Sequence, residues 1–149
     1  MQILLDNRQK KIKINRRRIK RTAERILKDL GCPDKELSLV LLDDYGITRL
    51  NKEFFRREGP TNVISFPMSE GPSSAINPQL LGDVVISLER AQEEAKKSGT
   101  PFEERLDYLL IHGILHLLGY DHQGSKTDAR RMRRKQKKLF VMLQGMAGK

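Results

Sequence analysis

The chain has 149 residues, of which 38% are hydrophobic and 32% are charged, and its formal net charge is +10 at pH 7. This length suffices for one domain with a hydrophobic core. The single cysteine, Cys32, excludes an intrachain disulfide and fits a reducing compartment. No apolar run approaches the roughly 20 residues of a membrane span, and the N-terminus lacks the apolar core of a signal peptide. We therefore expect a cytoplasmic protein with an anionic partner, most simply nucleic acid.

The hydrophobic pattern predicts four strands that are separated or flanked by helices. The expected fold class is therefore α+β, with about four strands in a mixed sheet and surrounding helices, in a single compact domain that spans residues 1–149. The predicted elements, in chain order, are a strand at 3–5, a helix at about 15–30, a strand at 36–42, a helix at 43–54, a strand at 62–67, a loop at 69–79, a strand at 82–87, a helix at 88–97, a helix from Pro101 and a helix at about 125–143.

Capping residues predict where several of these helices begin. Asn15 and Ser87 precede amphipathic segments and are suitable N-caps. Thr100 is expected to cap the next helix, because Pro101 suits its first position and Glu103 completes a capping box.

The most informative segment is His112-Gly-Ile-Leu-His116-Leu-Leu-Gly119-Tyr-Asp121-His122, which contains all three histidines of the chain. Histidines at i and i+4 lie one turn apart on a helix face, so both rings can reach one metal ion. Gly119 allows the chain to leave the helix and to return His122 toward the same ion. The sequence thus predicts one Zn²⁺ ion per chain, bound by His112, His116 and His122. A fourth, open position is typical of catalytic zinc.

The spacing HxxxHxxGxxH nearly matches the motif of zinc proteases and predicts a zincin-like metal helix. Gly113, however, occupies the position of the glutamate that serves those enzymes as general base. A zinc metallopeptidase of metzincin-like ancestry therefore remains only an alternative. Asp121, beside His122, can orient a ligand imidazole, act as a base or cap the turn. Asp83 can similarly support the site or simply serve the turn before its strand.

Positive charge is concentrated toward both ends of the chain. Residues 8–28 contain eleven lysines and arginines with one acid, and residues 126–138 contain eight with one acid. Together with a hydrolytic metal site, these runs favour a surface that binds nucleic-acid phosphates. Because aromatic residues make up only 5% of the chain, base stacking should be a minor contribution. The candidates for stacking are Phe54, Phe55, Phe66 and Tyr120.

Residues 112–122 resemble the signature HGxLHLxGYDH of the YbeY family of bacterial metal-dependent endoribonucleases, and every fixed position is present. Two further segments agree. Residues 50–67 are similar to the family's LN…PT(D/N)VLSFP stretch, and residues 81–86 are similar to its LGDI.I stretch. The resemblance therefore covers about residues 50 to 122.

This resemblance implies the family's α+β fold, zinc on the three histidines and cleavage of single-stranded RNA. The implied role is maturation of ribosomal RNA, notably at small-subunit ends, and ribosome quality control. The implied partners are the ribosome or its small-subunit proteins. A second alternative is a non-catalytic, zinc-stabilised ribosome-assembly factor, in which Cys32 would complete a structural site.

One departure from the family concerns an arginine. Family members usually carry Tyr-Arg after the LN segment, and that arginine is linked to activity. Gapless alignment places Phe54 and Phe55 at these two positions, with Arg56 and Arg57 immediately after them. A shift of one residue along a helix rotates a side chain by about 100°. Both arginines, together with Asp121, are therefore candidate catalytic residues, and the nucleophile is either water or an RNA 2′-OH.

Overall fold

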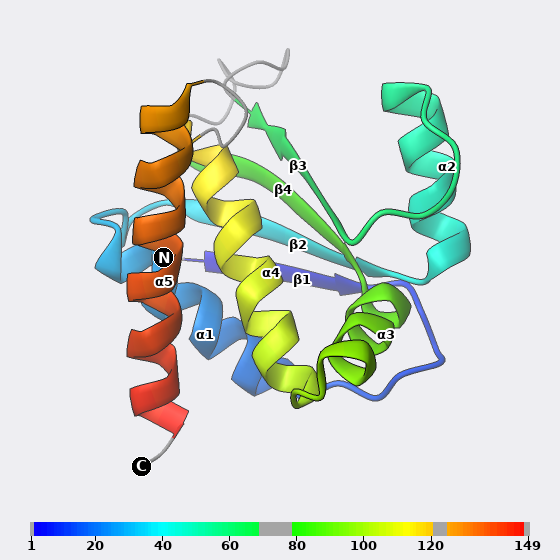
Figure 1. Ribbon diagram of the computed structural model, residues 1–149, viewed down its shortest axis with the longest axis horizontal. Coiled ribbons are helices and arrows are strands. Elements are labelled where there is room, and N and C mark those ends of the chain that lie inside the picture. The colour runs from blue at the N-terminus through cyan, green and yellow to red at the C-terminus, as the bar shows by residue number, and fades with distance from the viewer. Residues whose placement is uncertain (1, 69–78, 121–124, 148–149) are drawn as a thin grey trace.

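A four-stranded mixed sheet with helices on both faces forms the fold, as predicted (Figure 1). The computed structural model describes residues 2–68, 79–120 and 125–147. The predicted loop at 69–79 thus lies almost entirely outside the described residues. The elements are β1 (Gln2–Asn7), α1 (Arg16–Asp29), β2 (Glu36–Leu42), α2 (Asp44–Phe55), β3 (Val63–Pro67), β4 (Leu80–Ser87), α3 (Leu88–Ser98), α4 (Phe102–Leu117) and α5 (Lys126–Ala147).

The strands follow the order β1-β2-β4-β3 across the sheet. β1 and β4 both run parallel to β2, whereas β3 pairs antiparallel with β4 at the edge. Pro67 is the last residue of β3, an edge strand, where the lack of a backbone N–H is tolerated. This arrangement sets the edge strand β3 beside α4.

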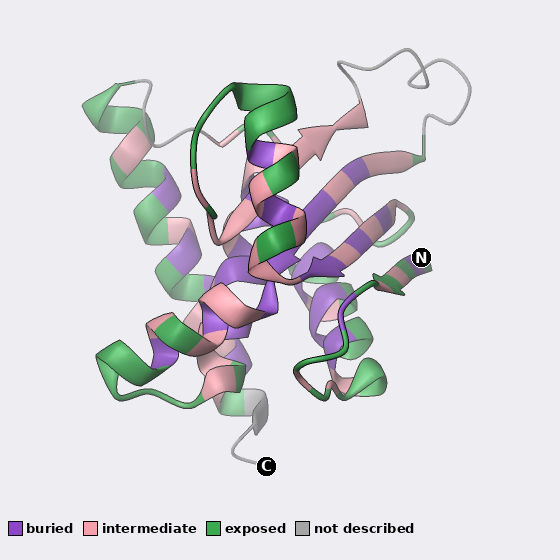
Figure 2. Cartoon of the chain, turned by 90° about the vertical axis from the view of Figure 1, so that its right-hand side faces the viewer, coloured by how far each residue is buried: buried purple, intermediate pink, exposed green. Residues whose placement is uncertain are grey.

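Different helices cover the two faces of the sheet. On β2, Leu37, Leu39 and Leu41 belong to one buried cluster with residues of α1, α3, α4 and α5. Val40 and Leu42, whose side chains alternate to the other face, pack in a second cluster with residues of α2. Figure 2 shows the resulting bands of buried residues along the strands. Among the described helices, α2 therefore packs on the second face of the sheet.

Most predicted helix starts are confirmed, but the cap at Thr100 is wrong. The side chains of Asn15 and Ser87 do accept hydrogen bonds from backbone amides in the first turns of α1 and α3. The N-cap of α4 is instead Pro101, which has no side-chain capping bond. The amide of Thr100 donates to the carbonyl of Ala95, so Thr100 closes the end of α3.

An ion pair between Arg18 and Asp107 joins α1 to α4. The Arg18 guanidinium donates two hydrogen bonds to the Asp107 carboxylate, at 3.1 and 2.9 Å. Asp107 is only 3% exposed, and this burial raises the pKa of its carboxyl group, whereas the nearby Arg18 acts to lower it. The pair therefore orients the beginning of the helix that carries the histidines.

The C-terminal helix α5 continues to Ala147, beyond its predicted end near residue 143. The Ser125 hydroxyl accepts a hydrogen bond from the Asp128 amide at 3.0 Å, as expected of an N-cap. Within the described part of the chain, no helix combines the length and the apolar composition that a membrane span requires.

Candidate metal centre and substrate cleft

Two of the predicted ligands, His112 and His116, face one another on α4. Their Nε2 atoms lie 3.2 Å apart, and the rings meet edge to face with centroids separated by 4.7 Å. Two imidazole nitrogens that bind one Zn²⁺ tetrahedrally at 2.0–2.1 Å lie about 3.3 Å from each other. The spacing of this pair therefore fits the donors of a single metal ion.

A buried amide on α5 orients one of these rings. The Oε1 atom of Gln136 lies 3.4 Å from Nδ1 of His112, and Gln136 is 6% exposed. The Oε1 atom can accept a hydrogen bond only from the His112 tautomer that is protonated on Nδ1, and that tautomer leaves the Nε2 lone pair available to a metal ion. A partner of this kind fixes the tautomer that a metal ligand needs.

Sequence reasoning missed Gln136, although one signal was present. It lies between Met132 and Leu139 in the apolar stripe of α5, and all three residues are buried. A polar side chain inside such a stripe normally has a hydrogen-bonding partner.

At Gly113, α4 packs closely against the sheet. A Cβ atom at this position would lie 2.6 Å from Cγ1 of Val84 and 3.2 Å from Cγ2 of Val63. The Ser65 hydroxyl also donates to the Gly113 carbonyl at 2.8 Å. The packing therefore leaves no room for the glutamate that a zinc protease carries at this position.

A cavity of about 410 Å³ opens beside the two histidines. Phe55 and Arg57, at the end of α2, form part of one wall, and His112 and His116 form part of another, with residues 61–67 between them. Among the described residues, no carboxylate lines this cavity. Its charge therefore suits an anionic ligand.

The two candidate arginines occupy different environments. Arg56 has a φ of 53°, and this left-handed conformation ends α2. Its neighbour Arg57 then donates its amide to the Asn51 carbonyl at 3.3 Å. Of the two arginines, only Arg57 is among the described residues that line the cavity.

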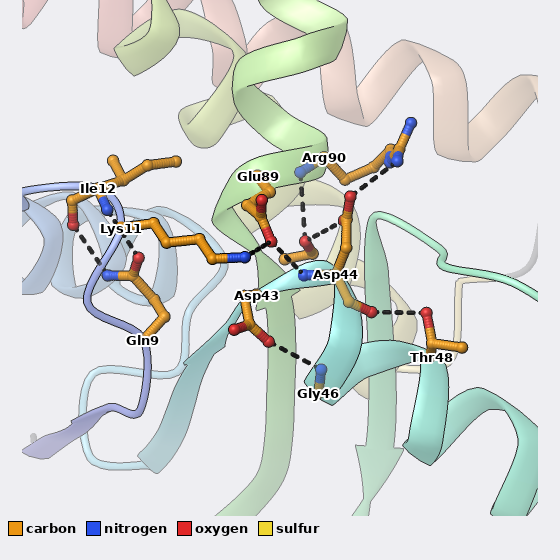
Figure 3. A network of polar contacts seen from close by, with 10 residues as sticks. Gln9, Lys11, Ile12, Asp43, Asp44, Gly46, Thr48, Glu89 and Arg90 are labelled. Atoms are coloured by element: carbon orange, nitrogen blue, oxygen red, sulfur yellow. Dashed lines mark hydrogen bonds and ion pairs between the residues drawn. The ribbon is translucent and has the colours of Figure 1, made fainter.

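Polar contacts with the start of α3 fix the start of α2, the helix that precedes Arg56 and Arg57 (Figure 3). The Asp44 carboxylate accepts hydrogen bonds from the Ser87 hydroxyl at 2.7 Å and from Arg90 at 2.8 Å. The Asp44 amide donates to the Glu89 carboxylate at 2.9 Å. These three bonds thus hold the start of α2 against Ser87 and the start of α3.

Among the described residues, the remaining predicted site residues do not line the cavity. Asp121 and His122 lie outside the described residues. Asp83 lines a separate groove on the α2 side of the sheet, so it does not support the histidine pair. The Cys32 thiol lies 3.6 Å from the Leu30 carbonyl. The described residues contain no group of three or more potential metal ligands, so Cys32 does not join the histidines.

Known proteins resemble this chain over nearly its full length. The family described as Endoribonuclease YbeY matches residues 4–144. An Endoribonuclease YbeY of Geobacter metallireducens is 48% identical over 145 residues, or 97% of each chain. One of Syntrophotalea carbinolica is 48% identical over 142 residues, or 95% of each chain. A solution structure of a Thermotoga maritima protein superposes with a TM-score of 0.70 at 28% identity, and covers 98% of this chain and 91% of that one.

Proposed function

The chain belongs to the YbeY family of endoribonucleases, and on this premise we propose that it is a metal-dependent hydrolase of single-stranded RNA. The proposed role is maturation of ribosomal RNA, notably of small-subunit ends, and ribosome quality control in the cytoplasm. One observation carries the proposal: a single cavity is lined by the histidine pair and by Arg57. Such a cavity favours a phosphodiester over a neutral peptide bond.

The proposed cofactor is one Zn²⁺ ion on His112 and His116, with His122 as third ligand. The Nε2 separation of 3.2 Å and the Gln136 contact support this assignment for the first two residues. Three neutral imidazoles leave the charge of the ion uncompensated, which suits an anionic substrate. A bound divalent cation supplies Lewis-acid polarisation of a phosphoryl oxygen.

Arg57 is the proposed catalytic cation of the protein itself. Its guanidinium can donate hydrogen bonds to phosphoryl oxygens and stabilise the charge that develops during cleavage. Asp121 is assigned to the same site, where it would orient an imidazole or accept a proton. The nucleophile is either water or the RNA 2′-OH.

Both alternatives are disfavoured by particular contacts. A peptidase needs a general base at position 113, where Gly113 is packed against Val84 and Val63. A structural zinc site needs a fourth protein ligand, and Cys32 lies outside any described group of potential ligands.

The proposal is tested with the purified protein, a labelled single-stranded RNA, the same RNA in a duplex and an unstructured peptide. We expect cleavage of the single strand alone, its loss on addition of a chelator and its return with Zn²⁺. Cleavage of the peptide, or RNA cleavage that resists the chelator, would contradict the proposed function.

A further inference from the structure

The exposed face of α5 carries an unusual density of positive charge. Eight lysines and arginines and one acid lie between Lys126 and Lys138. All eight are exposed except Lys135, which is half-buried. The opposite stripe of the helix packs into the core through Met132, Leu139 and Leu143. The cations are therefore held on the outside of a rigid element.

Within the described part of the chain these cations have no ion-pair partner, unlike some of those near the N-terminus. On α1, Arg18 pairs with Asp107 at 2.9 Å and Arg25 with Asp29 at 3.7 Å. No ion pair between described residues involves a side chain of α5. Like charges three and four residues apart on a helix repel one another. A polyanion bound along this face would relieve that repulsion.

The surface beside α5 is hollowed along a path that leads from the histidine helix. A depression of about 340 Å³ is lined by Leu118, Gly119, Tyr120, Asp128 and Arg131, and Leu118 is two residues from His116. A second depression, of about 260 Å³, is lined by Tyr120, Arg131, Arg134, Lys135 and Lys138. Tyr120 and Arg131 line both, so the two depressions are neighbours on the surface.

The chemistry of this path matches a single-stranded nucleic acid. The cations can neutralise consecutive phosphates without regard to sequence. Tyr120 offers one aromatic ring on which a base can stack. The same helix carries Gln136, whose side chain contacts His112. Through this contact, α5 packs beside the helix that carries the histidines.

We propose that the α5 track, defined as Tyr120, Arg131, Arg134, Lys135 and Lys138, binds the backbone of single-stranded RNA and leads it to the histidine cavity. This inference rests on the proposed function, because it assigns the RNA a path to that site. It also gives the two basic segments of the sequence different roles, because it assigns RNA binding to α5 and not to α1.

The test compares two variants that remove the same charge. The first replaces three exposed cations of the α5 track, as Arg131→Gln, Arg134→Gln and Lys138→Gln. The control replaces three exposed cations of α1, as Arg17→Gln, Lys20→Gln and Arg21→Gln. Affinity for a fluorescein-labelled 2′-O-methyl oligouridylate is measured by anisotropy over a series of salt concentrations, and gel electrophoresis checks that the probe stays intact. Circular dichroism checks the folding of each variant.

For the α5 variant, we expect the slope of log affinity against log salt to become shallower by about 2, at roughly 0.7 per lost phosphate contact. The α1 control should keep the slope of the unmodified protein. Equal slopes for the two variants would overturn the proposal and leave RNA cleavage untouched. Failure of the unmodified protein to cleave RNA would contradict the proposed function, while the binding slopes would still decide the α5 track.

Discussion

At the scale of single residues, the assignment of the catalytic arginine depends on backbone conformation. Arg57→Gln should lower the turnover of RNA cleavage by about 10²-fold, because a donor to the developing charge is lost. Arg56→Gly removes the same charge beside it, and glycine adopts the positive φ of 53° without strain. This control should keep activity within about two-fold and keep or raise thermal stability. A larger loss of turnover in Arg56→Gly than in Arg57→Gln would reverse the assignment.

Gln136 offers a second prediction at this scale. Gln136→Leu should weaken Zn²⁺ binding by about 10- to 100-fold, because the His112 tautomer and ring orientation lose their support. The same change should not lower the stability of the metal-free protein, since Nε2 of Gln136 is one of the described buried atoms without a hydrogen-bond partner. Calorimetric titration with Zn²⁺ and thermal unfolding measure the two effects. Unchanged Zn²⁺ affinity would mean that Gln136 only fills space.

At the scale of elements, the close contact of α4 with the sheet makes the stability of the fold sensitive to the size of the side chain at position 113. Gly113→Ala should destabilise the fold even though alanine is the better helix former, because overpacking costs about 1 to 3 kcal/mol and the helix gain is about 1 kcal/mol. Val84→Ala alone should also destabilise, through a cavity. Denaturant unfolding of the double variant should show a loss smaller than the sum of the two, since each change accommodates the other. A loss of stability in the double variant equal to the sum of the two single losses would contradict a direct contact between positions 113 and 84.

The ion pair between α1 and α4 gives a pH-dependent prediction. Arg18→Gln leaves the Asp107 carboxylate buried without its cation, so the folded-state pKa of Asp107 rises further above the unfolded value. A raised pKa in an acid destabilises the fold at pH above that pKa, and the loss shrinks as the pH falls through it. We expect a loss of about 2 to 3 kcal/mol in unfolding free energy at pH 7 and less toward pH of about 4.

The matched control for this pair is the double variant Arg18→Gln, Asp107→Asn. It has no titrating group at position 107, so its loss of stability should be nearly constant over the same pH range. If the single variant showed an equally constant loss, the buried carboxylate would not be the cause.

The elements were predictable where local signals decide them. The caps at Asn15 and Ser87 and the strand patterns correspond to the observed boundaries within a few residues. The cap at Thr100 was predicted wrongly because the Thr100 amide instead donates a hydrogen bond to the Ala95 carbonyl at the end of α3. That bond depends on how α3 and α4 meet.

The candidate site was predictable only in part. The i, i+4 spacing sufficed to place His112 and His116 together, because both lie on one helix. The contact with Gln136 joins two helices, and the choice of Arg57 over Arg56 depends on a left-handed turn that no residue type in the sequence demands. Both features depend on the tertiary arrangement rather than on local pattern.

At the scale of the whole molecule, the central claim is that RNA cleavage depends on one metal ion held by the histidine helix. The most direct measurement titrates metal-free protein with Zn²⁺ while cleavage of a labelled single-stranded RNA is followed, with His116→Ala beside it. The account predicts no cleavage without metal, a rise to a plateau at about one equivalent per chain and no rise in His116→Ala. Full cleavage by the metal-free protein, or an equal rise in His116→Ala, would contradict it.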